Sequence, residues 1–412
     1  MSDLLDGVRV LELAALLNGD YVGMLLGDMG ADVIKIESPG RGDYLRDMLG
    51  QLSPHHSPAH VQVNRNKRSM TLDLRLAAGR EVFFDLLATA DVFVDGYVAG
   101  TCDALGLGYD QLRERKPDLV YCHYSGFGAT GPYAMIPTHG QMMNSLAAAV
   151  PVELGDDDLV HVVERDEPMG GTRSGGEGTA AGGTHAALHV AAALVRRDRT
   201  GLGCYLDAAG ADGVVANGWM GAVYGLNDHR IADRQGLRPR GQGAHEGAKY
   251  QWYETRDHKF VLFCCIEHKF WSRFCEAVGR PDWVARTDEG GPVDFAHTDI
   301  GLRRELQSLF RTRDQTAWIT LAAAQDLPIG PCHQGALSLL DDAHLRQRTI
   351  LIEGEHPGAG PFTYVGEPVI VDRRTYEVRR PAPELGEHTG EVLAELGYTP
   401  ERVASLRAGG VI

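Results

Sequence analysis

Four basic side chains lie close together in a chain that is otherwise acidic. The chain carries 56 acidic and 40 basic residues, which gives a formal net charge of −16. The basic cluster comprises Arg65, Lys67, Arg68 and Arg75. Guanidinium and ammonium groups pair with phosphate oxygens, so this cluster is a candidate phosphate site. A solvated, charged turn would have the same composition, and both interpretations stay open from the residues alone.

A single carboxylate stands in a glycine-rich segment directly before an apolar stretch. Glu177 falls within residues 170–178, which are rich in glycine, and residues 180–196 are apolar enough to predict a long helix. The free amides at a helix N-terminus carry partial positive charge, which favours an anion. Glu177 can therefore be a reactive carboxylate held at the start of this helix, or simply the residue that caps it.

Two further patterns suggest chemistry that we do not expect here. Residues 126–131 match the G-x-G-x-x-G pattern of dinucleotide sites, but Pro132 and Tyr133 follow where a helix should begin. We therefore expect no NAD or other nicotinamide cofactor. Residues 55–60 contain three histidines in a proline-containing segment without a carboxylate or cysteine, so we expect a solvated loop and no metal site.

The first forty residues predict the element that positions a ligand. Residues 8–13 and 31–37 are rich in Val, Ile and Leu and flank a helix-length segment, as in a buried parallel β-α-β unit. In open parallel sheets, ligands bind at the carboxyl ends of the strands. Three residues follow the first strand at this position: Leu16, Leu17 and Asn18.

Strand and helix patterns continue to alternate through residues 119–124, which predicts an α/β fold with a parallel sheet. A chain of 412 residues is long enough for two domains.

The negative charge of the chain repels nucleic acid and anionic membranes, so we expect neither as a partner. Seven cysteines without a C-x-x-C pair, together with an N-terminus unlike a secretion signal, favour a cytoplasmic protein.

Several motifs, taken together and in order, resemble the class III CoA-transferase family, also called CaiB/BaiF. Each motif alone is a weak signal, but together they span nearly the whole chain. The motifs are Gly30-Ala-Asp-Val-Ile-Lys-Ile-Glu37, Asn66-Lys-Arg-Ser69 with Leu72-Asp-Leu74, Leu105-Gly-Leu-Gly-Tyr109, Gly126-Phe-Gly-Ala-Thr-Gly-Pro-Tyr133 and Leu385-Gly-Glu-His-Thr389.

This resemblance implies an acyl-CoA enzyme in which a Rossmann-like large domain comes from both ends of the chain. The large domain would comprise residues 1–215 and 341–412, and residues 216–340 would form a smaller α+β domain. The resemblance also implies a dimer of two chains threaded through each other as interlocked rings. The partner chain would be a second copy or a paralogue.

The resemblance also implies which residues hold coenzyme A. Family members bind it through the loop after the first strand, here Leu16 to Asn18, and through the positions of Leu72 and Arg75. The position of Tyr97 belongs to the nucleotide pocket. Arg75 keeps the basic character that attracts a CoA phosphate, which favours the phosphate interpretation of the basic cluster.

One departure from the family affects the reaction itself. In the transferases, a Gly-Asp pair before the long helix supplies the carboxylate that forms an acyl anhydride and then a thioester with CoA. The Asp position falls on Thr179 here, and a threonine cannot form this anhydride. Glu177 lies two residues away, and its longer side chain can replace the missing carboxylate.

Other positions resemble the α-methylacyl-CoA racemases of the same family. His139 stands where these enzymes have a histidine, and Glu267 lies in a segment like the one that carries their glutamate. Removal of the α-proton of a thioester needs a base with a pKa near neutral, and a hydrogen-bonded carboxylate orients an imidazole for this role. The opposing acid of the racemases is again the missing Asp, so Glu177 would have to take its place.

Three functional hypotheses follow. The first is transfer of CoA between an acyl-CoA and a carboxylic acid, with Glu177 as the covalent carrier. The second is α-proton chemistry on a bound acyl-CoA by His139 and Glu267. The third is a non-catalytic subunit that pairs with an active paralogue. None of the three requires a metal.

Overall fold

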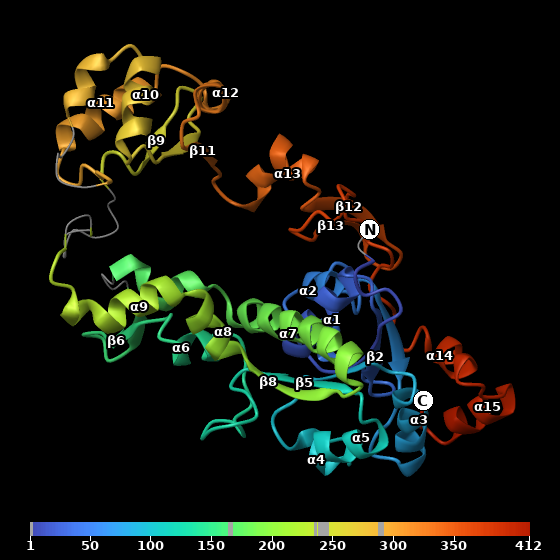
Figure 1. Ribbon diagram of the computed structural model, residues 1–412. Helices are drawn as coiled ribbons and strands as arrows, with labels where there is room; N and C mark the ends of the chain where they lie inside the picture. Colours follow the sequence, from blue (N-terminus) through green and yellow to red (C-terminus); the bar gives the residue numbers. More distant parts are fainter. Residues whose placement is uncertain (1–2, 164–167, 235–236, 238–246, 287–291) are drawn as a thin grey trace. The chain divides into compact units, whose positions relative to one another are not determined.

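The computed structural model describes residues 3–163, 168–234, 237, 247–286 and 292–412 (Figure 1). The chain divides into two compact units, which are described separately. The first unit combines Met1–Val163, Gly171–Ala222 and Ala343–Ile412. The second unit combines Glu164–Gly170 and Val223–Asp342.

A six-stranded parallel sheet forms the centre of the first unit, as the alternating pattern predicts. Its strands are β1 (Arg9–Leu13), β2 (Asp32–Glu37), β3 (Lys67–Thr71), β4 (Val92–Asp95), β5 (Val120–Ser125) and β8 (Cys204–Ala209). The strand order is β3-β2-β1-β4-β5-β8, and all neighbours run parallel. The chain proceeds outward in opposite directions from β1 and β4, so the ligand crevice of such a sheet is expected at their carboxyl ends.

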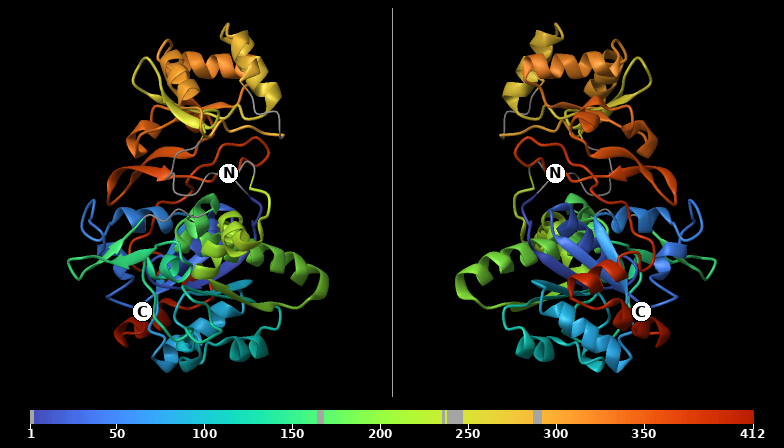
Figure 2. Two further views of the ribbon diagram at one scale, coloured as in Figure 1. Left: turned by 90° about the vertical axis from the view of Figure 1, so that its left-hand side faces the viewer. Right: turned by 90° about the vertical axis from the view of Figure 1, so that its right-hand side faces the viewer.

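Helices cover both faces of this sheet. On one face, α1 (Asn18–Asp28) and α7 (Gly178–Thr200) pack apolar residues such as Val22 and Val190 against the strands. On the other face lie α3 (Ala77–Leu87) and the C-terminal helix α14 (Thr389–Glu395), with Phe83 and Leu393 in the core. The end of the chain thus returns to the first unit, and Figures 1 and 2 show α14 and α15 (Pro400–Ala408) near α3.

Short elements complete the first unit. They are α2 (Pro58–Val63), α4 (Thr101–Ala104), α5 (Tyr109–Arg115), α6 (Met142–Leu146), α8 (Gly210–Asn217), α13 (Ala343–Gln347) and the hairpins β6 (Val152–Leu154) with β7 (Val160–Val162) and β12 (Leu351–His356) with β13 (Gly360–Val365). The predicted solvated loop at residues 55–60 was wrong in part, because Ser57 caps α2 and His60 is buried within it.

The second unit has a small antiparallel sheet covered by helices. Its strands are β9 (Gln251–Glu254), β10 (Phe260–Phe263) and β11 (Ile329–Cys332), in the order β11-β10-β9. Its main helices are α10 (His268–Ala277), α11 (Ile300–Phe310) and α12 (Gln315–Gln325). The boundary between the two units falls within α9 (Trp219–Asn227), whose first residues belong to the first unit and whose last residues belong to the second. An aromatic core holds the unit together, in which the ring of Phe310 stacks on Tyr253 and contacts Trp318. Among the described residues, no helix is both long and apolar enough to span a membrane.

A close approach of two backbones fixes the start of α1 over the sheet. A Cβ added to Gly19 would lie 2.4 Å from the Cβ of Ala14 and 3.1 Å from the Cα of Gly96. Gly96 directly follows β4, so only a residue without a side chain lets α1 begin this close to the strand ends. The position of the β1–α1 turn therefore depends on Gly19.

We predict that Gly19→Ala lowers the free energy of unfolding by about 1–3 kcal/mol, because the new methyl group overlaps the Cβ of Ala14 and crowds the backbone of Gly96. Urea unfolding followed by circular dichroism measures this change. Gly390→Ala is the matched control, because Gly390 is also helical and its added Cβ would have no neighbour within 4 Å. Equal stability of the two variants would contradict the proposed close packing.

Candidate active site

The turn between β1 and α1 is held by one buried carboxylate. Leu16 has a φ of +64°, a conformation that non-glycine residues rarely adopt. Its N–H lies 3.1 Å from both carboxylate oxygens of Asp43, and Asp43 also accepts a hydrogen bond of 2.9 Å from the N–H of Leu45. Asp43 therefore clamps the predicted CoA loop in an otherwise unfavourable conformation.

Asp43 belongs to a network of charges beneath this turn. The ammonium group of Lys35 lies 3.0 Å from Asp43 and 3.3 Å from Glu12, and Lys67 lies 2.7 Å from Glu12. All four side chains are at most 1% exposed. Burial opposes ionisation of Asp43, but Lys35 and the two backbone N–H groups outweigh it and hold the pKa of this carboxyl well below its usual range.

Two further buried groups of the network favour their neutral forms. Burial raises the pKa of Asp20 well above its usual value, although the nearby Lys35 opposes the shift. Burial, and then the charges of Arg46 and Lys35, lower the pKa of His60 to about 2. Lys35 contacts Glu12, Asp20 and Asp43, and Lys67 contacts Glu12, so the two lysines are the cations among these buried carboxyl groups.

The predicted phosphate site in the basic cluster was wrong for three of its four members. Arg65 is paired with Asp28, Lys67 with Glu12, and Arg68 with Asp32, and each of the three cations is at most 4% exposed. Burial of such charges is costly unless they are paired, so these residues serve as core ion pairs. Arg75 is the exception, because its side chain is 78% exposed.

The other predicted CoA contacts lie after β3 and β4, at the same edge of the sheet as Leu16. Arg75 forms a two-point ion pair with Asp73, which leaves the guanidinium facing solvent. The side chain of Leu72 is buried in the core, so its backbone is what a ligand can reach. Tyr97 is half-buried, its N–H donates to Asp95, and burial raises the pKa of its hydroxyl to about 12.

Glu177 is the N-cap of α7, which corresponds to the capping interpretation of this carboxylate. Its two carboxylate oxygens accept hydrogen bonds from the N–H groups of Thr179 at 3.0 Å and Ala180 at 3.1 Å. The residue is exposed, so its carboxylate can be reached from solvent. The side chain of Thr179 points to α1, where its hydroxyl lies 3.4 Å from the Oδ1 atom of Asn18.

The start of α7 is fixed from two sides. The side chain of Asn144 accepts from the N–H of Gly178 and donates to the carbonyl of Gly176. The hydroxyl of Tyr124, from β5, donates to the carbonyl of Thr179 at 2.7 Å. The N-termini of α1 and α7 therefore lie next to each other. Asn18 is the first residue of α1, and Glu177 is the N-cap of α7.

The two residues of the proposed base pair lie in different units. His139 is exposed, and the preceding Thr138 covers Gly126 at the carboxyl end of β5, where an added Cβ would lie 2.1 Å from the threonine hydroxyl. Glu267 precedes α10 in the second unit and makes no capping hydrogen bond through its side chain. A pairing of His139 with Glu267 therefore stays a prediction.

A hydrogen-bonded group at the ends of β4 and β5 was not predicted from the sequence. His123 contacts Asp95 through one ring nitrogen and Ser125 through the other. His123 and Ser125 alternate along a strand, so they share one face of the sheet. In the sequence, His123 and Ser125 are polar residues at the end of an otherwise apolar strand, and this change in character was the signal that could have identified them.

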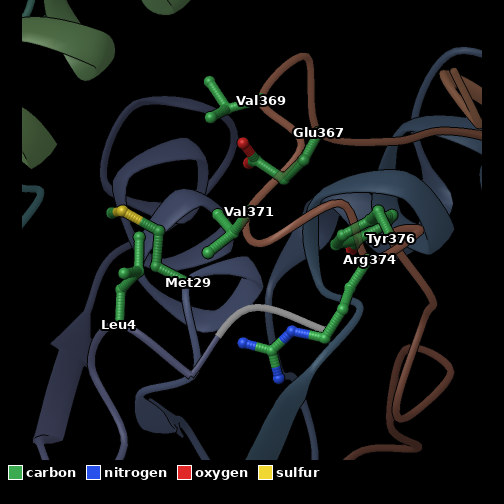
Figure 3. A pocket seen from close by; sticks show the side chains of 7 residues that line it. All are labelled: Leu4, Met29, Glu367, Val369, Val371, Arg374 and Tyr376. Atoms are coloured by element: carbon green, nitrogen blue, oxygen red, sulfur yellow. The ribbon is translucent and has the colours of Figure 1, made fainter.

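A separate pocket of about 160 Å³ lies at the other end of α1 (Figure 3). It is lined by Leu4, Met29, Glu367, Val369, Val371, Arg374 and Tyr376. Burial, and then the nearby charge of Asp28, raise the pKa of Glu367 to about 7. Figure 3 shows Arg374 turned away from this carboxyl, and Arg374 is paired with Asp3 instead. This pocket lies away from the predicted CoA loop, because Met29 follows the last turn of α1 and Asn18 begins the first.

Within the described part of the chain, no three His, Cys, Asp or Glu side chains form a group that could hold a metal ion.

The chain is similar over its whole length to known proteins. It is 29% identical to a formyl-CoA:oxalate CoA-transferase of Rhodopseudomonas palustris (strain BisB18), with 100% of this chain and 98% of the relative covered. It is 33% identical to a succinyl-CoA:mesaconate CoA-transferase of Haloarcula hispanica, with 95% and 96% covered.

The fold is similar to that of a CaiB/BaiF family protein from Brucella suis, whose crystal structure is known. The TM-score is 0.68 at 27% identity, and the match covers 95% of this chain and 99% of that one. The model of the family described as CoA-transferase family III matches residues 5–389. The resemblance seen in the sequence motifs is thereby confirmed, and the chain belongs to CoA-transferase family III.

Proposed function

We propose that this protein transfers CoA from an acyl-CoA to a free carboxylic acid, with Glu177 as the covalent carrier. CoA would lie along the carboxyl ends of β1, β3 and β4, against Leu16, Leu17, Asn18, Leu72, Arg75 and Tyr97. The CoA-transferase relatives support a reaction of this class. The shape of the substrate pocket determines which acyl group and which acid react.

One contact carries the assignment of Glu177. The Thr179 hydroxyl lies 3.4 Å from Asn18, so the start of α7 adjoins the loop expected to hold CoA. Glu177 is the nearest carboxylate before Thr179 along this segment, and it is exposed. A flexible glutamate two residues ahead of the family's Asp position can thus reach a thioester bound at the same edge.

The proposed reaction balances without any other reagent. A carboxylate oxygen of Glu177 attacks the thioester carbonyl, the carbon–sulfur bond breaks, and a mixed anhydride and the CoA thiolate form. The thiolate then attacks the glutamyl carbonyl, which releases the first acid and leaves a glutamyl-CoA thioester. The second acid attacks this thioester and repeats the two steps in reverse order, which regenerates Glu177.

The N-terminus of α7 has two roles in this scheme. In the resting state, the N–H groups of Thr179 and Ala180 hold the Glu177 carboxylate. Such a cap contributes about 1 kcal/mol, which is small enough for the side chain to leave it during the reaction. The freed N–H groups then become donors for the oxygen that gains negative charge in each addition step.

We also propose that the protein works as an interlocked homodimer in the cytoplasm. Its large domain would comprise residues 1–215 and 341–412, and its small domain would comprise residues 216–340. Apolar side chains on α7, α8 and the start of α9 support a partner surface, because Leu188, Val195, Val215 and Trp219 are all exposed. All seven cysteines are free, which fits a reducing compartment. Light scattering should give the mass of two chains.

The racemase-like alternative, with His139 as a base supported by Glu267, has one observation in its favour. His139 is exposed, and its neighbour Thr138 covers the carboxyl end of β5, so an imidazole is available near the edge expected to hold CoA. The same exposure is common for surface histidines, which is why we place this function second.

One experiment separates these functions. The purified protein is incubated in deuterated water with a panel of acyl-CoAs, with and without succinate, and the products are followed by mass spectrometry. We expect succinyl-CoA to form without deuterium at the acyl α-carbon. Deuterium uptake in the absence of an acceptor would favour the His139 chemistry instead. Failure of both reactions would favour a non-catalytic subunit with an active paralogue.

We predict that Glu177→Gln lowers kcat for CoA transfer by at least about 1000-fold, because an amide cannot form the anhydride. The glutamine carbonyl still caps α7, so thermal stability should change little. Glu153→Gln, at an exposed glutamate of the β6–β7 hairpin, is the matched control and should keep full activity. Near-normal transfer by Glu177→Gln would exclude this residue as the carrier.

We predict that Asp43→Asn raises KM for the acyl-CoA about tenfold and lowers kcat less. The amide clamps Leu16 more weakly and leaves Lys35 without one of its anionic partners, so the CoA loop loses its fixed conformation. Asp118→Asn, at a half-buried carboxylate that is also paired with a lysine, is the control for loss of a carboxylate. A change in kcat alone would argue that this loop does not bind CoA.

A further inference from the structure

Three side chains at the carboxyl ends of β4 and β5 form a continuous hydrogen-bonded chain. The Oγ of Ser125 lies 3.2 Å from Nε2 of His123, and Nδ1 of His123 lies 3.2 Å from Oδ2 of Asp95. Serine, both imidazole nitrogens and a carboxylate are thus connected in the order used by serine hydrolases. All three residues are at most 8% exposed.

The sheet itself creates this arrangement. His123 and Ser125 are two positions apart on β5, so their side chains project from the same face. His123 is the register partner of Asp95 on β4. The three groups are therefore fixed by strand pairing rather than by mobile loops, and their geometry needs no rearrangement to relay a proton.

The contacts fit one tautomer of a neutral imidazole. With Nδ1 of His123 as the donor to the carboxylate of Asp95, Nε2 keeps its lone pair. The free lone pair then accepts from the Ser125 hydroxyl. The hydroxyl of Tyr121 donates to the same Asp95 oxygen at 2.9 Å, and burial raises the pKa of Tyr121, so it stays a neutral donor.

We propose that Ser125, His123 and Asp95 form a nucleophilic triad that hydrolyses acyl thioesters, an activity separate from CoA transfer. The location supports a substrate bound at the carboxyl ends of the strands, where the CoA loop is also predicted, because Asp95 is the last residue of β4 and Ser125 is the last residue of β5.

The reaction consumes only the thioester and water. Ser125 Oγ attacks the thioester carbonyl while Nε2 of His123 takes its proton, and the imidazolium is stabilised by Asp95. The carbon–sulfur bond breaks, and the leaving CoA thiolate takes the proton from Nε2, which leaves an acyl-serine ester. A water molecule then attacks this ester, gives its proton to Nε2, and the released serine oxygen takes that proton back. The products are CoA, the carboxylic acid and the regenerated hydroxyl.

A fluorophosphonate probe tests the nucleophile directly in the unmodified full-length protein. The probe phosphonylates serines that are activated by a neighbouring base, and peptide mass spectrometry locates the modified residue. We expect modification at Ser125 and a parallel loss of acyl-CoA hydrolysis, measured as free thiol without any acceptor acid. Labelling elsewhere, or no labelling of the folded protein, would overturn the proposal.

Variants provide the second measurement and need only the thiol assay. Ser125→Ala should lower acceptor-independent hydrolysis at least tenfold, whereas CoA transfer to an added acid should persist. Ser308→Ala, at an exposed helical serine, is the matched control and should change neither rate. Unchanged hydrolysis in a folded Ser125→Ala protein would overturn the triad, whereas loss of transfer in Glu177→Gln alone bears only on the transferase.

Discussion

The buried ion pairs beneath the β1–α1 turn are the interaction on which the candidate site depends. Lys35 holds Asp43, and Asp43 holds the left-handed Leu16 through its N–H. Lys67 and Glu12 complete the charge balance, and Gly23 of α1 leaves the space they need, because a Cβ there would lie 1.7 Å from Glu12. Removal of one partner would leave a buried charge with fewer opposite charges around it, which destabilises the turn and the strands beneath it. The loop conformation is therefore tied to the stability of the whole sheet.

Two helix N-termini converge at this turn, and their meeting gives the site its chemical character. Each end presents N–H groups without partners inside the helix, which favours negative charge from phosphates, carboxylates and developing oxyanions. Asn18 and Thr179 join the two ends, and Asn144 with Tyr124 fixes the start of α7. A thioester bound between them would have a carboxylate and amide donors on one side. The Ser125–His123–Asp95 chain lies along the same edge of the sheet, with Asp95 on β4 next to β1 and the other two residues on β5.

Much of the fold could be predicted from the sequence, because periodicity reports burial. The β-α-β opening and the helix before residue 196 follow from apolar runs and their spacing, although α7 extends further at both ends than predicted. Side-chain pairing could not be predicted in this way. Arg65, Lys67 and Arg68 have the composition of a phosphate site, and only their partners Asp28, Glu12 and Asp32, distant in sequence, make them core residues. The hydrogen-bonded group around His123 could not be predicted for the same reason, since Asp95 comes from another strand.

The central claim is that Glu177 carries the acyl group and then CoA. Hydroxylamine cleaves anhydrides and thioesters and leaves a hydroxamate on the carboxyl that carried them, so it marks the carrier. The full-length protein is incubated with an acyl-CoA, treated with hydroxylamine, digested, and analysed by peptide mass spectrometry. We expect a hydroxamate on Glu177 that is absent without acyl-CoA and absent in Glu177→Gln. A hydroxamate on another carboxylate, or none during active CoA transfer, would contradict it.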